Sequence, residues 1–534
     1  MLIDITPSGG IAPRINPRSL PATGAQIALN SRMDMGDLRP WDGPQAAGVA
    51  VPGAKTIYRF GQAVADDTLY WLQFLADVSV VRGPIAGDTV ETTYITGLDV
   101  PRFTTSDAAI SAAPYPTSTY KLGVPKPAAA PTLATSGTAA GDTTETRAYV
   151  YTNVSTIGNL AQESAPSAAA LITVTGQNVA LTLDSVPSGY LTTARRIYRT
   201  TGTTGKYYFV AEVPAATLSF TDTVPAAGLQ EELPSEGWLM PPAALRGLTA
   251  LPNGIMAGFV GRDLWFCEAF RPYAWPSKYA LATDYPVVGL GVYGQSLVVG
   301  TTGYPYIVSG TDPASMSMQR LDFPQACMSR RSVVGIPGGV AYACPDGIAV
   351  IGENTLRVIT AEQFTAAQWQ AAYFPASIHA YLYDSKYIGF YDSGKGQSGG
   401  FVLDLATGQF SPLGFYADAG YADLTTDTLY LAVGGEIHRW AKGAALTFTW
   451  RSKVFQTPRP MNFGMAQVEA TGYPVQFSLI ADGVTVHTQA VTGRDPFRLP
   501  SGYRADSVEV ELSSATARVT RVRLGHGADE VQND

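Results

Sequence analysis

Between residues 245 and 441 the sequence repeats one pattern, in which runs of Val, Ile, Tyr and Phe are separated by Gly or Asp turns. The repeats begin near Val287, Ser332, His379 and Ala417, roughly 40–45 residues apart. Runs of β-branched and aromatic residues between turn-formers predict antiparallel strands, and this period is typical of propeller blades. The sequence therefore predicts an all-β chain with a β-propeller over 236–445. A pair of stacked sandwiches is the alternative.

The same strand pattern occupies residues 51–124, which we interpret as the first part of the propeller, with one four-stranded unit ending near Gly97. A Pro- and Ala-rich linker over 123–131 follows, and then a self-contained set of strands that includes the hairpin "RRIYRTTGTTGKYYFVAEV". Residues 196–223 resemble the second half of a fibronectin type III domain. We therefore predict an inserted fibronectin type III-like domain over 125–235.

The segments after residue 446 alternate apolar and polar residues with period two, as in "LTFTWRSKVF", "VQFSLIADGVTVHTQAV" and "RVTRVRLG". This alternation is typical of half-buried strands, and Asp482-Gly483 is a strong hairpin turn. The pattern predicts a separate C-terminal β-sandwich over 446–534, which ends in the polar tail "GADEVQND".

One helix is expected, within the segment "TAEQFTAAQWQAAY" that begins at Thr360. Thr360 is a good N-cap, Gln363 completes a capping box, and Pro375 lies just beyond the expected end. Its shortness suggests a connector between two blades.

Residues 1–50 begin with an unusual segment. Prolines at every fourth position alternate with apolar and basic residues: Pro13, Pro17, Pro21, Ile11, Ile15, Leu20, Arg14 and Arg18. Because proline fixes φ and removes a backbone donor, this segment can form neither a helix nor an interior strand. We predict an extended N-terminal arm over 1–50. A stiff arm loses little entropy on docking, so it would clamp a neighbouring subunit through Arg14 and Arg18. The alternative is an arm folded back on its own propeller.

Composition restricts the class of protein. Of the 534 residues, 46% are apolar and only 15% are charged, against roughly 25% charged in ordinary soluble domains. The net charge of −8 argues against DNA wrapping and against a polybasic membrane patch. No basic and apolar leader and no run of 18 apolar residues occurs, so we expect neither a signal peptide nor a membrane-spanning segment. We expect synthesis in a cytosol and a soluble product.

The sequence offers no convincing chemical site, and we predict no catalytic, cofactor-binding or metal-binding residues. Residues 396–400 match GxSxG, but a strand-like run follows them where a nucleophile elbow needs a helix. The histidines lack the paired spacing of metal ligands: His379, His438, His487 and His526. The carboxylates Asp346, Asp404 and Asp482 lie in turns, which use Asp for local hydrogen bonds. The cysteines are expected to be buried apolar residues: Cys267, Cys327 and Cys344.

The segment "FRPYAWP" over 270–276 is dense in aromatic residues and flanked by prolines, so it cannot be an interior strand. Tyr, Trp and Arg are the residue types that dominate protein interfaces. We interpret it either as a contact loop or as a packed corner of a blade.

Several segments together resemble structural proteins of tailed bacteriophages. They are "GGIAPRINPRSLPATGAQIALNSRMDMGDLRPW", "FRPYAWPSKY", "FTWRSKVFQTPRPMNFGMAQV" and "DPFRLPSGYRADSVEVELS". The family that they resemble is the tail nozzle, or tail tubular protein B, of short-tailed phages. The resemblance implies a propeller-containing subunit of a virion ring, expected to be hexameric, below the adaptor and portal. Such a ring continues the DNA channel, retains the genome, supports its ejection and anchors tail fibres or spikes.

Two other functions stay open at this point. One is a carbohydrate-binding or carbohydrate-active propeller, although the repeated SxDxGxTW loop of sialidase-like propellers is missing from the sequence. The other is an intracellular propeller scaffold. Within the nozzle hypothesis, the acidic balance suits a channel wall that contacts genomic DNA only passively, because Lys and Arg would hold the phosphates.

Overall fold

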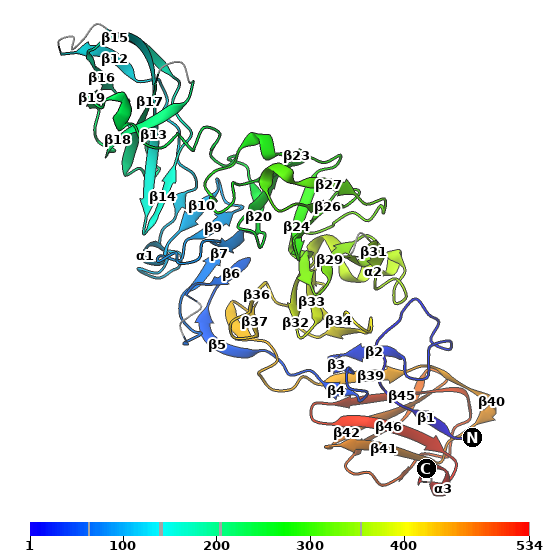
Figure 1. Ribbon diagram of the computed structural model, residues 1–534. Helices are drawn as coiled ribbons and strands as arrows, with labels where there is room; N and C mark the ends of the chain where they lie inside the picture. The colour runs from blue at the N-terminus through cyan, green and yellow to red at the C-terminus, as the bar shows by residue number, and fades with distance from the viewer. Residues whose placement is uncertain (62–64, 138–142, 202–204, 353–354, 533–534) are drawn as a thin grey trace. The chain divides into compact units, whose positions relative to one another are not determined.

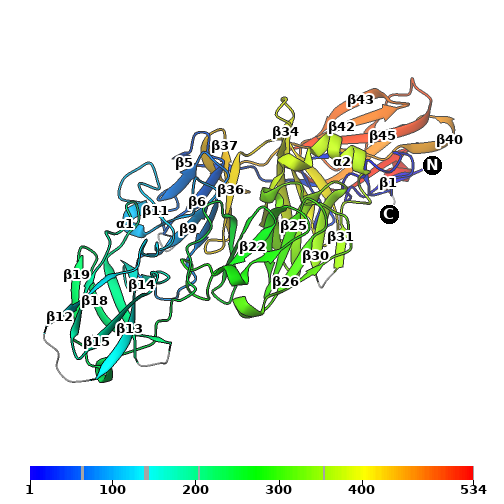
Figure 2. The same cartoon turned by 90° about the horizontal axis from the view of Figure 1, so that it is seen from above.

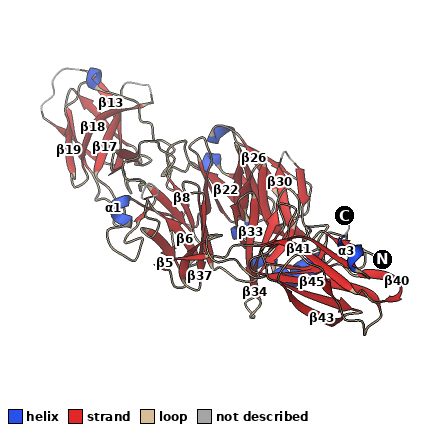
Figure 3. Ribbon diagram, turned by 90° about the horizontal axis from the view of Figure 1, so that it is seen from below, coloured by secondary structure: helices blue, strands red, loops and turns tan. Residues whose placement is uncertain are grey.

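The computed structural model describes residues 1–61, 65–137, 143–201, 205–352 and 355–532. Strands dominate it, as Figure 3 shows, and the prediction of an all-β chain is confirmed. The described residues form three short α-helices, α1 (Ser106–Ala109), α2 (Ala366–Tyr373) and α3 (Ala528–Gln532). None of these helices is long or apolar enough to cross a membrane. The chain divides into two compact units, 1–69 with 298–306 and 320–534, and 70–297 with 307–319.

Consecutive four-stranded antiparallel sheets form one part of the first unit (Figure 1). The first sheet contains β28 (Val334–Ile336), β29 (Gly339–Cys344), β30 (Gly347–Gly352) and β31 (Thr355–Val358). The second contains β32 (His379–Tyr383), β33 (Lys386–Asp392), β34 (Ser398–Asp404) and β35 (Phe410–Leu413). The third contains β36 (Ala419–Asp423), β37 (Thr428–Val433), β38 (Glu436–Arg439) and β5 (Gln45–Ala50).

These sheets follow the predicted repeat closely. They begin at Val334, His379 and Ala419, within two residues of the expected positions. Their first strands lie next to one another, β28 beside β32 and β32 beside β36. The first two sheets are therefore blade-like meanders, and the third is a three-stranded meander to which β5 adds a fourth strand. A closed propeller ring stays a prediction.

The C-terminal sandwich is the other part of the first unit. Its strands after residue 446 are β39 (Phe448–Ser452), β40 (Phe455–Met461), β41 (Met465–Thr471), β42 (Val475–Ala481), β43 (Val484–Val491), β44 (Phe497–Arg498), β45 (Ala505–Ser514) and β46 (Arg518–Gly525). Figure 2 shows β42, β43 and β45 side by side. The Asp482-Gly483 turn joins β42 to β43 with φ values of 46° and 80°, the positive φ pair of a type I′ hairpin turn.

Several strands within the predicted N-terminal arm, residues 1–50, pair with strands elsewhere in the chain. β1 (Ile3–Ile5) pairs with β46, and β2 (Ala25–Leu29) pairs with β39, so both belong to the C-terminal sandwich. β3 (Ser31–Arg32) pairs with β4 (Arg39–Pro40). β5 completes the third four-stranded sheet. Within the proline-rich residues 7–21, Ile11 forms an isolated bridge with Ala25, and no named strand lies in this described range.

The second unit contains two further four-stranded sheets. One has β8 (Ser79–Arg82), β9 (Thr93–Thr96), β10 (Arg102–Thr104) and β11 (Tyr120–Lys121). The other has β20 (Arg246–Ala250), β21 (Met256–Val260), β22 (Asp263–Phe266) and β23 (Leu281–Ala282). Their side chains share one core, to which Tyr94, Leu248, Met256 and Trp275 belong.

A two-sheet sandwich lies between these sheets in the chain. Its strands are β12 (Thr132–Ser136), β13 (Thr144–Ile157), β14 (Leu160–Glu163), β15 (Ala170–Thr175), β16 (Asn178–Thr182), β17 (Ala194–Thr200), β18 (Tyr207–Pro214) and β19 (Ser219–Asp222). One sheet has the order β12-β16-β19, and the other has the order β14-β13-β17-β18 with β15 also on β13. Tyr149, Leu181 and Ile197 from the two sheets share a core of their own. The predicted hairpin is β17–β18, although turn residues 202–204 lie outside the described residues.

The remaining strands lie near the points where the chain passes from one unit to the other. They are β6 (Thr56–Arg59), β7 (Trp71–Phe74), β24 (Val287–Tyr293), β25 (Ser296–Thr301), β26 (Tyr306–Ser309) and β27 (Ser317–Arg320). The described residues also form short 3-10 helices at Ala226–Gly228, Ser277–Tyr279, Pro313–Ser315, Arg330–Ser332 and Pro375–Ser377.

The predicted helix starts later than expected. α2 is capped by Thr365, whose side chain and that of Gln368 form the capping box. Thr360 is unavailable as a cap because its hydroxyl accepts a hydrogen bond from the backbone N–H of Ile348 at 2.9 Å. The helix does lie between two sheets of the chain, as a connector would.

Candidate functional site

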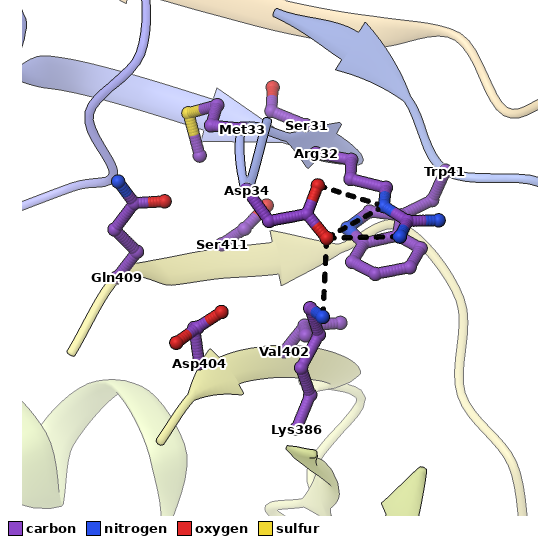
Figure 4. Close-up of a pocket in the computed structure, with 10 residues that line it drawn as sticks. All are labelled: Ser31, Arg32, Met33, Asp34, Trp41, Lys386, Val402, Asp404, Gln409 and Ser411. Atoms are coloured by element: carbon purple, nitrogen blue, oxygen red, sulfur yellow. Dashed lines mark hydrogen bonds and ion pairs between the residues drawn. The ribbon is translucent and has the colours of Figure 1, made fainter. Parts of the chain in front are cut away.

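A concentrated set of charged side chains in the first unit surrounds Asp34, at a small pocket shown in Figure 4. Asp34 follows β3, and β4 returns beside β3, so the turn over 33–38 presents its carboxylate to side chains on both strands. The pocket's other wall comes from β33, β34 and β35, where Lys386 is the first residue of β33. Residues more than 340 positions apart in the sequence therefore meet at this carboxylate.

Three cations contact Asp34. The Nε of Arg32 lies 3.1 Å from Oδ1 and its Nη2 lies 2.9 Å from Oδ2, which is a two-pronged contact. The Nη2 of Arg39 lies 3.1 Å from Oδ1, and the Nζ of Lys386 lies 3.2 Å from Oδ2. Asp384 adds a second carboxylate, 3.1 Å from Lys386 and 3.3 Å from Arg32.

The electrostatics of the cluster follow from these contacts. Burial alone would raise the pKa of Asp34, but hydrogen bonding and the charges of Arg32 and Lys386 lower it to about 2. Burial alone would lower the pKa of Arg32. The hydrogen bond to Asp34 and the charge of Asp34 outweigh burial, so the pKa of Arg32 is raised. The Arg32 guanidinium also lies 4.7 Å from the centre of the buried Trp41 ring. Such stacking fixes the guanidinium plane for bidentate contact.

This site holds the chain together and has no room for a ligand. The pocket has a volume of about 20 Å³, which is room for about one water molecule. The charges nearly balance, because Asp34, Asp37 and Asp384 face Arg32, Arg39 and Lys386. The cluster therefore fastens the N-terminal segment to the β32–β35 sheet, and we call it the Asp34 cluster.

The arm residues that the sequence singled out pack on their own chain. The N–H of Ile11 donates to the carbonyl of Phe410 at 3.1 Å, and the amide of Gln368 donates to the carbonyl of Pro13 at 2.9 Å. Ile11 and Leu20 are buried. Arg14 is exposed and donates to the carbonyl of Ala361, and Arg18 is exposed as well.

The candidate residues for chemistry are placed separately. Ser398 begins β34 and no helix follows it. His379 is buried, with Nε2 2.8 Å from the carbonyl of Ala417, and burial lowers its pKa well below 6.5. Asp404 accepts from the N–H groups of Ala406 and Thr407, as a turn residue does.

The cysteines and the remaining histidines give no metal or nucleophile site. All three cysteines are buried and free, as expected, and burial raises each thiol pKa to about 12. The other histidines lie in β38, in β43 and before α3. Across the described ranges, no three His, Cys, Asp or Glu side chains are grouped as metal ligands.

The "FRPYAWP" segment has a buried half and an exposed half. Tyr273 and Trp275 are buried in a core of the second unit. Phe270 is 54% exposed and Arg271 is exposed, and a contact role for them stays a prediction.

Sequence reasoning missed the Asp34 cluster. Its local signal was the spacing of Arg32, Asp34 and Arg39 in "RMDMGDLRPW", a segment quoted above only for its family resemblance. The partner Lys386 gave no signal, because a lysine before a strand is common.

Comparisons with known proteins give distant likenesses only. No family model and no curated protein matches the chain. Among solved structures, it is similar to YCF48 bound to a D1 peptide, with a TM-score of 0.30 and 10% identity over 75% of this chain and 96% of the other. BBS1N in complex with ARL6DN gives a TM-score of 0.29 and 9% identity over 75% and 95%. The AfRom2 CNH domain gives 0.26 and 8% over 63% and 91%. Likenesses this weak carry no argument about function.

Proposed function

We propose that the chain is a structural subunit of a bacteriophage tail, the nozzle that continues the DNA channel below the portal and adaptor. In this proposal identical copies form a hexameric ring in the virion, after synthesis in the host cytoplasm. The ring retains the genome, supports its ejection and anchors tail fibres or spikes. The finer fold assignments, a closed propeller and a fibronectin type III class for residues 125–235, belong to the same proposal.

One observation carries the proposal beyond the resemblance itself. Three of the resembling segments, 9–41, 448–468 and 495–513, are far apart in the sequence. They supply β2, β39, β41, β44 and β45, which are strands of one sandwich. Their side chains share a core that includes Ala28, Trp450 and Leu512. A resemblance that falls on one packed domain supports common ancestry better than scattered short matches do.

The experiment is to purify the full chain and measure its mass by sedimentation, with negative-stain images of the same sample. We expect a multi-subunit ring with a central hole. A monomer across the micromolar range would contradict the proposal. Binding or hydrolysis of glycans by that monomer would favour the carbohydrate alternative.

A further inference from the structure

A groove in the second unit has the features of a peptide-binding site. It is lined by Tyr94, Asn159–Gln162 and residues 269–273, with Ile85 at its side. Its volume is about 390 Å³, which lies within the roughly 300–1,000 Å³ usual for ligand pockets. One wall is the β13–β14 hairpin of the inserted sandwich, and the other is the "FRPYAWP" loop.

The basic group of the groove lacks an anionic partner. Arg271 is exposed, its Nη1 lies 3.5 Å from the carbonyl oxygen of Ala269, and no ion pair of the described residues includes it. The guanidinium lies 4.6 Å from the centre of the Trp238 ring, and Trp238 in turn packs edge-on against Tyr273 at 6.0 Å. The aromatic stack therefore holds a cation in place at the rim, where it is available to an external carboxylate.

Gln162 gives the groove a second polar group. It lines the groove, and the residue as a whole is only 3% exposed. Its side-chain amide offers both a donor and an acceptor to a ligand.

The exposed ring of Phe270 is the third signal. Phe270 has a φ of 57°, in the left-handed region that bulky residues avoid. Its N–H donates to the carbonyl oxygen of Gly254 at 2.8 Å. Its ring packs so closely on Gly254 that a Cβ atom on residue 254 would lie 2.5 Å from the ring. Backbone strain that keeps an aromatic ring 54% exposed indicates a functional contact.

The groove also presents part of a strand edge, which determines the kind of ligand. On this edge the N–H of Glu163 already donates to the hydroxyl of Tyr273, so the pairing positions are those of Ala161. β14 is the edge strand of its sheet, and Gly158 and Asn159 form the two-residue turn that joins it to β13. Leu160 and Gln162 therefore bond back to β13, and the N–H and C=O of Ala161 are directed away from it. An extended peptide can pair with such an edge, whereas a saccharide does not form that ladder.

We propose that this groove binds an extended segment of a partner protein that carries an acidic side chain next to an apolar one. The peptide backbone pairs with Ala161, the carboxylate binds Arg271, and the apolar side chain covers Phe270. This inference does not rest on the proposed function, because it uses only the chemistry of the groove.

The test starts with the full chain and a display library of random octapeptides. Selected peptides are labelled with fluorescein and their Kd is measured by anisotropy. We expect one Asp or Glu beside apolar residues among the selected sequences. Loss of a charge-assisted hydrogen bond of about 1.5–3 kcal/mol predicts a roughly 10- to 100-fold weaker Kd for Arg271→Gln.

The other variants separate specific binding from damage to the fold. Phe270→Asn removes the ring with a residue that tolerates positive φ, and it should also weaken the Kd. Arg262→Gln removes an exposed charge outside the groove and should leave the Kd unchanged. All three should unfold at the wild-type temperature.

Three outcomes would overturn the proposal. The first is selection without a preference for acidic residues. The second is binding that Arg271→Gln and Phe270→Asn leave unchanged. The third is an Arg271-dependent interaction with oligogalacturonate, or with a second copy of the chain, in place of the peptides.

Discussion

Replacing Asp34 by Asn should release the N-terminal segment from the β32–β35 sheet. The pKa of Asp34 is about 2 against an ordinary value of 3.8, and each pKa unit corresponds to about 1.4 kcal/mol. The ionised Asp34 therefore stabilises the packing of the N-terminal segment on the β32–β35 sheet by about 2 kcal/mol. This corresponds to a change of some 30-fold in the equilibrium for local release of the segment. The Asp34 side chain is 16% exposed at the rim of the pocket, and solvent screening makes about 2 kcal/mol an upper value.

Hydrogen exchange measured by mass spectrometry on peptides covering 31–41 reports that opening directly. At pH 7 we expect Asp34→Asn to exchange faster there by about that factor. Because the folded pKa is lowered, the stabilisation is complete above the unfolded pKa near 4 and is lost as the pH falls through about 2. The difference between variant and wild type should shrink over the same range.

The control is Asp384→Asn. Asp384 belongs to the same cluster, but its side chain is 53% exposed, and exposed ion pairs contribute about 0–1 kcal/mol. Equal protection of residues 31–41 in wild type and Asp34→Asn would refute the reasoning. So would a difference that persists undiminished at pH 2.

Three further predictions concern stability and reactivity. Asp222→Asn should lower the calorimetric stability of the inserted sandwich by about 3–5 kcal/mol, because it leaves the fully buried Arg199, 2.8 Å away, without its anion. Glu212→Gln removes one charge of the more exposed Arg196–Glu212 pair and should change the stability of the sandwich little. Ile5→Ala should destabilise the C-terminal sandwich by about 2–5 kcal/mol, seen as faster hydrogen exchange in β46, whereas exposed Thr6→Ala should not. The three thiols, each with its pKa at about 12, should resist a disulfide reagent at pH 8 and react only after unfolding.

Local patterns predicted the sheets well where each strand pairs with its neighbour in the chain. The consecutive strands that begin at Val334, His379 and Ala419 need only short turns between them, and strand propensity and turn chemistry specify those strands together. The α2 cap was placed five residues early because Thr360 and Thr365 look alike in sequence. Only the contact of Thr360 with Ile348 distinguishes them.

Long-range pairing could not be predicted in the same way. β5 has the sequence "QAAGVA", which lacks strand propensity, and it is a strand because β38 offers it an edge. The Asp34 cluster depends on Lys386 for the same reason. A sequence pattern reports the residue types at such a site, but the tertiary fold decides which of them meet.

The packing of the N-terminal segment bears on the two hypotheses for the arm. Ile3, Ile5, Ile11 and Leu20 are all buried on the segment's own chain, and burial of one such side chain contributes about 1.5–3 kcal/mol. Loop-closure entropy opposes this only weakly, since a tenfold longer loop costs about 2 kcal/mol more. A clamp formed by the whole of residues 1–24 would have to replace that burial on a neighbour, and β1 would have to exchange into a second copy. Residues 13–19 form an exposed loop that needs no such exchange. They carry the exposed Arg14 and Arg18, and Pro13 and Arg14 also hydrogen-bond to Gln368 and Ala361 of the same chain. A contact between subunits through this segment is therefore a contact of the exposed loop, made while the strands on either side stay in their own sheets.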